Sequence, residues 1–127
     1  MRLSTKTFHF DSAHRLPEYP GKCMQLHGHT WSFWIEVDGT PDPDTDMVID
    51  FHDLNGMAKA VTDPLDHIYL NDILPNPTAE NLLLYLADKF DLIKDEKYDD
   101  IPLNTVTFYL QEGEGGTASH EVNYGNL

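Results

Sequence analysis

A His-x-His pair at the start of an alternating run constrains the fold more than any other feature of the sequence. At a spacing of two, the run reads His27, His29, Trp31, Phe33, Ile35 and Val37. Side chains along a β-strand alternate between its two faces, so both imidazoles share the face that the apolar residues bury. The pattern predicts a strand over residues 27–37 that is anchored by core packing and begins with two convergent imidazoles.

A third histidine ends an upstream segment that is predicted as a strand over residues 3–14. Phe8 and Phe10 share the parity of this histidine, whereas His9 faces the other way and is expected at the surface. Three neutral nitrogens with a fourth position left open are the usual ligand set of catalytic zinc. We therefore interpret three residues as zinc ligands: His14, His27 and His29. Seven histidines in 127 residues also produce close pairs by chance, so spacing alone leaves a metal-free alternative open.

The composition indicates one soluble domain over residues 1–127. The N-terminus lacks the apolar centre of a signal peptide, and the longest apolar run, residues 82–87, is too short to span a bilayer. The single cysteine, Cys23, has no partner for an internal disulfide, which fits a reducing compartment. We expect a cytoplasmic protein that contacts no membrane.

Charge is distributed unevenly along the chain. The formal net charge is −14, which disfavours nucleic acids and anionic membranes as partners because binding to them depends on basic residues. The first 30 residues carry four basic and two acidic residues, so the remainder of the chain carries −16. The segment with the three histidines and Cys23 is therefore the only positive one and is suited to receive an anion. With so few charges, a chance distribution stays open.

Two irregular segments and one helix are predicted on either side of the 27–37 strand. Residues 15–26 and 38–46 are rich in turn-forming residues and are expected to be loops, the second followed by a short strand over residues 47–49. The acidic residues of the second loop lack the glycine and the terminal glutamate of a calcium loop. Asp50 is a candidate N-cap for a helix whose buried stripe is predicted to be Phe51, Leu54, Met57, Ala58 and Val61.

The second half of the chain predicts one more helix and two strands. Pro64 ends the first helix, and Asn76 or Thr78 can cap the second. The buried stripe of the second helix is predicted to be Leu83, Leu86, Ala87 and Phe90. Residues 91–101 are expected to form an acidic connection. Alternating apolar residues then lead to Glu112, and residues 117–124 are predicted to return antiparallel as the last strand.

The predicted elements give an α+β domain with a four-stranded antiparallel sheet and two helices on one of its faces. This arrangement leaves Trp34 on the helix-free face and leaves the outer strand edges unpaired. Closing several such sheets into a shared barrel would remove both liabilities. We therefore expect an oligomer.

Several motifs, taken in chain order, resemble the 6-pyruvoyltetrahydropterin synthase family. The matching segments cover nearly the whole chain: residues 8–16, Cys23 with residues 26–29, residues 47–51, residues 65–67, residues 77–81 and Glu112. The three residues between Cys23 and His27 resemble the bacterial 6-carboxytetrahydropterin synthase branch of the queuosine and 7-deazaguanine pathway. This resemblance implies that 7,8-dihydroneopterin triphosphate is converted to 6-carboxy-5,6,7,8-tetrahydropterin, acetaldehyde and triphosphate.

The resemblance also assigns roles to individual residues. Zinc would be held by the three histidines named above, Cys23 would act as a base, and Asp66 with His67 would exchange protons. Glu112 would anchor the pterin ring, although Gly113 replaces the usual threonine and Glu114 is a second candidate anchor. The implied assembly is the tunnelling fold, a homohexamer of two stacked trimers in which Asp66 and His67 serve the site of a neighbouring subunit.

Three other functions remain compatible with these residues. A 6-pyruvoyltetrahydropterin synthase shares most of the site. A non-catalytic zinc protein that binds a pterin would keep the histidines and Glu112 but would not need Cys23, Asp66 and His67 together. A zinc hydrolase would need a water-activating carboxylate near the metal. Taken alone, Cys23 is also compatible with a buried packing residue.

Overall fold

The computed structural model describes residues 1–125 and contains two long helices and six strands. The strands are β1 (Arg2–Ser4), β2 (Phe8–His14), β3 (His27–Gly39), β4 (Ile68–Tyr69), β5 (Leu103–Glu112) and β6 (Gly116–Asn123). The helices are α1 (Phe51–Thr62) and α2 (Ala79–Lys97), with short 3-10 turns η1 (Lys22–Met24), η2 (Asp63–Leu65) and η3 (Leu70–Asp72). Neither long helix is long and apolar enough to cross a membrane.

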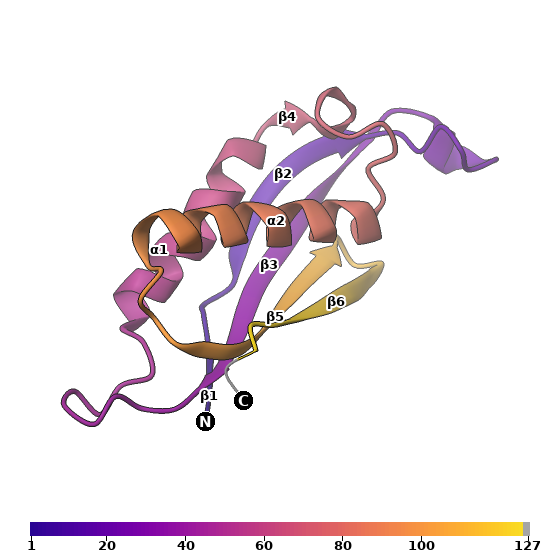
Figure 1. Cartoon of the computed structure of the whole chain (residues 1–127). Helices are drawn as coiled ribbons and strands as arrows, with labels where there is room; N and C mark the ends of the chain where they lie inside the picture. Colours follow the sequence, from indigo (N-terminus) through magenta and orange to yellow (C-terminus); the bar gives the residue numbers. More distant parts are fainter. Residues whose placement is uncertain (126–127) are drawn as a thin grey trace.

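The strands form one mostly antiparallel sheet in the order β4-β2-β3-β5-β6, and β1 also pairs with β3. Both long helices lie on the same face of this sheet, α1 against β2 and β3 and α2 against β5 and β6 (Figure 1). The predicted α+β class and the one-sided helix layer are therefore correct. The predicted number of four strands is wrong, because the sheet also contains the short strands β1 and β4.

The first strand is divided where a single strand over residues 3–14 was expected. Thr5, between β1 and β2, is buried, and its hydroxyl oxygen accepts a hydrogen bond from the backbone N–H of Ile35 at 3.0 Å. The backbone N–H of Thr5 donates to the Ile35 carbonyl at 2.9 Å. The hydroxyl of Thr5 thus takes the place of a backbone carbonyl as the acceptor for the Ile35 N–H. The regular backbone pairing with β3 is interrupted at this point.

The core lies between the sheet and the helices, and β3 supplies its centre. The four apolar residues of β3 that share the parity of His27 are fully buried: Trp31, Phe33, Ile35 and Val37. On β5, Val106, Phe108 and Leu110 are buried in the same way. The period-two pattern therefore identified the buried face of both strands correctly, and it places His27 and His29 at the end of this buried row.

Helix α1 begins as predicted, but its first residues and the segment before it differ from expectation. The Asp50 carboxylate accepts a hydrogen bond from the backbone N–H of His52 at 2.8 Å, which is an N-cap contact. Phe51 is 53% exposed and does not belong to the buried stripe. Residues 47–49 do not form a strand; Val48 and Ile49 are buried by packing instead of by sheet pairing.

Helix α2 is capped by Thr78, whose hydroxyl accepts a hydrogen bond from the backbone N–H of Asn81 at 3.1 Å. The helix continues to Lys97, so the acidic connection predicted for residues 91–101 begins too early. Lys94 explains the extension: its side chain is buried and its ammonium lies 5.0 Å from the ring centroid of Tyr124. Tyr124 also donates a hydrogen bond to Asp91, so the end of the sheet packs on the last turns of α2.

Candidate metal and active site

Three histidines converge at one end of the sheet on the face that the helices cover. His14 is the last residue of β2 and pairs directly with His27, the first residue of β3, while His29 lies opposite Ser12. One ring nitrogen from each histidine lies within 4.8 Å of the other two. The three ring centroids are 4.5 to 5.1 Å apart. The predicted juxtaposition of His14, His27 and His29 is therefore present in the fold.

Backbone carbonyls orient two of these imidazoles. Nδ1 of His14 lies 2.8 Å from the carbonyl oxygen of Pro77, and Nδ1 of His27 lies 2.8 Å from that of Gln25. A carbonyl can only accept, so each Nδ1 carries the proton and each Nε2 presents a lone pair. Nε2 of His14 and Nε2 of His29 are buried and have no hydrogen-bond partner among the described residues. The lone pairs of these Nε2 atoms fit a metal ion that prefers nitrogen ligands.

Burial favours the neutral form of His14 and of His29. Loss of hydration lowers the pKa of His14 and of His29 below the ordinary value of 6.5, and the carboxylate of Glu112 opposes this effect only in part. The Trp31 ring packs edge-on against both imidazoles, with centroid distances of 5.2 and 5.5 Å. The fully buried Trp31 indole thus packs against two imidazoles of the cluster. The neutral form favoured at His14 and His29 is the form that binds a cation.

Glu112 lies beside the histidine cluster and lines a cavity. Its Oε1 is 3.5 Å from Nε2 of His29. The cavity, of about 480 Å³, is bounded by the loop after β2, the start of α2 and the start of β6. Its walls include Leu16, Tyr19, Thr78 and Glu80 together with Glu112. Glu114 is exposed in the following turn and is not among the lining residues, so of the two candidate carboxylates only Glu112 lines this cavity.

Cys23 lies on the 3-10 turn η1, four residues before His27. Its thiol is free and half-buried. Its carbonyl oxygen accepts a hydrogen bond from the backbone N–H of Leu16 at 2.7 Å, which joins the two ends of the loop between β2 and β3. Cys23 is thereby connected to Leu16 in the cavity wall, and its role as a base stays a prediction.

The predicted pair of Asp66 and His67 lies apart from the cluster of His14, His27 and His29, on the helix-free side of β2. A carboxylate oxygen of Asp66 accepts from the backbone N–H of Asp11 at 2.8 Å, and the other lies 2.9 Å from Nδ1 of His67. The backbone N–H of His67 in turn donates to the Asp11 carbonyl at 2.6 Å. The Asp11 amide, and then His67, hold the pKa of Asp66 below 3.8. His67 adopts a left-handed φ of 59°, which these contacts hold in place.

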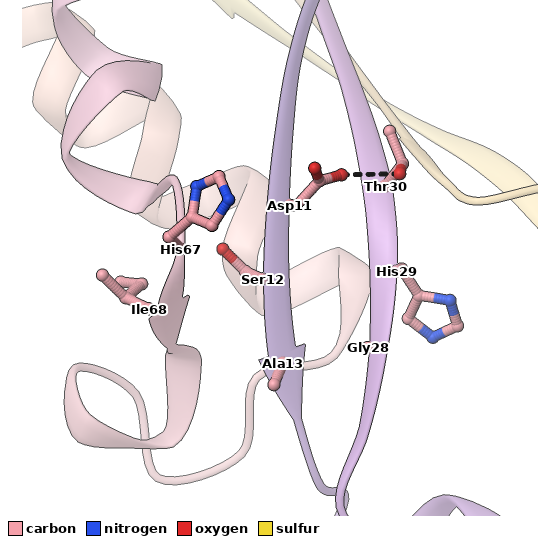
Figure 2. Close-up of a pocket in the computed structure, with 8 residues that line it drawn as sticks. All are labelled: Asp11, Ser12, Ala13, Gly28, His29, Thr30, His67 and Ile68. Carbon is pink, nitrogen blue, oxygen red and sulfur yellow. Dashed lines mark hydrogen bonds between the residues drawn. The ribbon is translucent and has the colours of Figure 1, made fainter.

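Figure 2 shows the pocket that His67 lines together with Asp11, Thr30 and His29. Its volume is about 570 Å³. The hydroxyl of Thr30 donates to the Asp11 carboxylate at 2.6 Å. Asp11 and Ala13 alternate with Ser12 and His14 along β2, so the side chain of Asp11 points to the opposite face from that of His14. Sequence reasoning missed Asp11 and Thr30. Both alternate with buried residues of their strands, and they lie opposite each other on β2 and β3, which could have indicated this second cluster.

Sequence comparison assigns the chain to a group of related proteins. A family model described as 6-pyruvoyl tetrahydropterin synthase matches residues 4–121. A 6-carboxy-5,6,7,8-tetrahydropterin synthase of Synechocystis is 38% identical over 102 residues, which cover 72% of this chain and 76% of the relative. Another protein of that name, from Haemophilus influenzae, is 43% identical over 72 residues, which cover 54% of this chain and 51% of the relative.

Structural comparison agrees with the sequence matches. The 6-pyruvoyl tetrahydropterin synthase of Caenorhabditis elegans superimposes with a TM-score of 0.76 at 25% sequence identity. The superposition covers 97% of this chain and 96% of the nematode chain. The fold is therefore shared over practically the full length of both proteins.

Proposed function

Because the chain belongs to the 6-pyruvoyl tetrahydropterin synthase family, we propose that it is a zinc-dependent 6-carboxy-5,6,7,8-tetrahydropterin synthase of the queuosine and 7-deazaguanine pathway. With one water molecule, 7,8-dihydroneopterin triphosphate would give 6-carboxytetrahydropterin, acetaldehyde and triphosphate. The observation that carries the proposal is the cluster of three imidazoles, two of them oriented by backbone carbonyls, beside the carboxylate of Glu112. The names of the Synechocystis and Haemophilus relatives support this product over others.

The residues at the cluster fit a zinc ion, which His14, His27 and His29 would hold through three nitrogens. When bound, zinc supplies Lewis-acid polarisation of the substrate's side-chain oxygens. The chain's own contribution is orientation, because the carbonyls of Pro77 and Gln25 hold two of the rings.

Other residues of the chain supply binding and proton transfer. Glu112 would accept hydrogen bonds from the ring N–H and amino groups of the pterin and so fix its position in the cavity. Cys23 would remove a proton from the side-chain carbons of the substrate. His67, oriented by Asp66 at 2.9 Å, would exchange protons with the substrate.

The position of His67 supports a site that is shared between subunits. Within one chain, His67 lies beside Asp11, whose side chain points to the helix-free face of β2, whereas His14 points to the helix-covered face. His29 is the one residue of the three-histidine cluster that also lines the pocket of His67. A neighbouring copy would therefore supply His67 and Asp66 to each metal site. The assembly that we propose is a homohexamer of two trimers, in which barrel closure also covers Trp34 and Tyr109, whose rings stack 5.2 Å apart on this face.

A second candidate function is 6-pyruvoyl tetrahydropterin synthesis, which is favoured by the name of the nematode structure that matches the whole chain. Both reactions would start from the same substrate and use the same metal cluster. They differ in the mass of the pterin product and in the release of acetaldehyde.

Turnover of 7,8-dihydroneopterin triphosphate by the zinc-loaded protein tests the proposal. Mass spectrometry of the pterin and trapping of acetaldehyde should detect the 6-carboxy product. A 6-pyruvoyl product without acetaldehyde would support the second candidate. Absence of any turnover by a fully metal-loaded oligomer would reject both reactions and leave a pterin-binding protein.

A further inference from the structure

Asp11 holds the pair of Asp66 and His67 with its backbone and places its own side chain beside them. Its backbone N–H donates to the Asp66 carboxylate at 2.8 Å, and its carbonyl accepts from the backbone N–H of His67 at 2.6 Å. One carboxylate oxygen of Asp11, one of Asp66 and a ring nitrogen of His67 lie within 4.8 Å of one another. The imidazole of His67 therefore has a second carboxylate close to it, in addition to that of Asp66.

Thr30 fixes the orientation of this second carboxylate. It lies opposite Asp11 in the pairing of β2 with β3, and its hydroxyl donates to the Asp11 carboxylate at 2.6 Å (Figure 2). Both residues line the pocket that His67 lines. The strand pair thus presents the Asp11 carboxylate to the pocket in one defined position, although the side chain is exposed.

The charges of this cluster favour a proton on the imidazole. Two carboxylates at this separation repel each other, and a positive charge close to both offsets the repulsion. Nδ1 of His67 lies 2.9 Å from the Asp66 carboxylate, which can only accept, so Nδ1 carries a proton. Nε2 is then the ring nitrogen that gains or loses a proton.

The other ionisable groups around His67 are accounted for by their own contacts. Asp63, whose carbonyl accepts from the backbone N–H of Asp66, has its carboxylate paired with Lys59. His29 lines the same pocket and lies 3.5 Å from a carboxylate oxygen of Glu112. The carboxylates grouped with the His67 imidazole are therefore those of Asp66 and Asp11.

We propose that Asp11 is a positioning residue that raises the protonated fraction of His67 near neutral pH. The inference rests on the proposed function, since it takes His67 as the residue that exchanges protons with the substrate. The imidazolium gives its Nε2 proton to the substrate and becomes neutral imidazole, while Nδ1 keeps its proton and its contact with Asp66. A proton from water restores the imidazolium.

Acylation of His67 by diethyl pyrocarbonate tests the proposal without turnover, because the reagent attacks the unprotonated imidazole. The zinc-loaded wild type and Asp11→Asn are treated over a range of pH, and the peptide with His67 is quantified by mass spectrometry. In Asp11→Asn the pH of half-maximal acylation rate should fall by about half a pH unit, the scale for two unit charges about 5 Å apart in water. Asp63→Asn is the matched control and should keep the wild-type value, since Asp63 is exposed but paired with Lys59.

Substitutions of Thr30 give a second test that leaves Asp11 in place. Thr30→Val removes the hydroxyl that orients the carboxylate and should shift the acylation midpoint in the same direction by a smaller amount. Thr30→Ser keeps the hydroxyl and should restore the wild-type midpoint. Zinc content is measured in both variants, because Thr30 follows the proposed ligand His29.

The pH dependence of kcat provides the link to the reaction. Activity that needs a protonated His67 falls as pH rises, and in Asp11→Asn this fall should begin at lower pH. Wild-type acylation midpoints in Asp11→Asn and Thr30→Val, or an equal shift in Asp63→Asn, would overturn the role of Asp11. Shifted midpoints in a protein without any pterin turnover would instead reject the proposed reaction and keep the effect of Asp11 on His67.

Discussion

The two histidine clusters of this domain lie on opposite faces of the same pair of strands and are built differently. The cluster of His14, His27 and His29 is packed on Trp31, and His14 is fully buried. The cluster of Asp11, Asp66 and His67 is exposed and is held by a network of backbone and carboxylate hydrogen bonds. In the first, Nε2 of His14 and Nε2 of His29 have no hydrogen-bond partner among the described residues. In the second, Nδ1 of His67 lies 2.9 Å from the carboxylate of Asp66.

This difference suits the two clusters to different roles, metal binding and proton exchange. Burial lowers the pKa of His14 and His29 and favours the uncharged form that a metal needs. A histidine that exchanges protons has to reach solvent or substrate in both of its forms, and His67 is exposed. In the function that we propose, the strand pair β2–β3 would use one face for metal binding and the other for proton exchange, which suits a site shared between subunits.

The largest effect is expected from His14→Ala. The substitution removes one of three proposed ligands and opens space in a fully buried position, so bound zinc and turnover should both fall to background and the melting temperature should decrease. Zinc per subunit, measured by atomic emission, is the readout. His9→Ala is the control, because His9 is exposed on the same strand and contacts Ser32 at 3.0 Å. Full zinc in the His14 variant would exclude this residue as a ligand.

Cys23→Ala should lower kcat by about 10² or more, the usual scale for a positioned acid or base. The variant should fold and retain zinc, because Cys23 contributes its backbone carbonyl and not its thiol to the loop hydrogen bond. The thiol of the wild type should alkylate quickly near neutral pH, and substrate should protect it. Near-normal turnover with a modest loss of stability would instead identify Cys23 as a packing residue.

His67→Ala should lower kcat on the same scale of about 10² and leave zinc binding intact, because His67 lies on the other face of β2. Mixing inactive Cys23→Ala and His67→Ala subunits should restore part of the activity if neighbouring chains share a site. A lack of complementation after proven subunit exchange would place both residues in the site of one chain.

Asp66→Asn should have a smaller effect, roughly tenfold on kcat, because the amide keeps the shape of the carboxylate but loses the charge that orients His67. Stability should change little at this exposed position. Asp63→Asn serves as the control, since Asp63 is also exposed and pairs only with Lys59. Equal kinetic losses in both variants would show that His67 does not depend on Asp66.

The smallest effect is expected on the stability of the metal-free protein when the pH is lowered. His14 and His29 have lower pKa values when folded than the ordinary 6.5, so the unfolded chain takes up more protons as pH falls below 6.5. Stability should therefore be constant from this source above pH 6.5 and decline below it, by at most about 1.4 kcal/mol per pH unit for each histidine. Denaturant titrations at pH 7.5 and 5.5 check this, and a His14→Gln variant should decline less steeply.

The sequence predicted the parts of the fold that depend on periodicity and capping. Alternation identified the buried faces of β3 and β5, and the cap at Asp50 was placed correctly. Of the two candidate caps of α2, Asn76 and Thr78, the structure shows Thr78. The histidine cluster was predictable because His27 and His29 continue the buried row of β3.

The remaining features depend on contacts between distant segments. β4 is only two residues long and exists because Ile68 and Tyr69 pair with Ser12 and Ala13, which no local pattern indicates. The last turns of α2 contain Lys94, whose ammonium lies over the ring of Tyr124, a residue 30 positions further along the chain. Phe51 occupies a stripe position of α1 but lies at its first turn, beyond the edge of the core.

The hydrogen bond between His14 and the carbonyl of Pro77 bears on when the candidate metal site would be completed during folding. His14 and His27 face each other as soon as β2 and β3 pair, but the acceptor that fixes the His14 tautomer lies 63 residues away in sequence, just before α2. Contacts between distant residues form late, since the chain must first close a long loop. Newly made chains would therefore bind an ion weakly on the strand pair and tightly only after α2 has packed on the sheet. The amount of metal retained during refolding would then measure how many chains have completed the core.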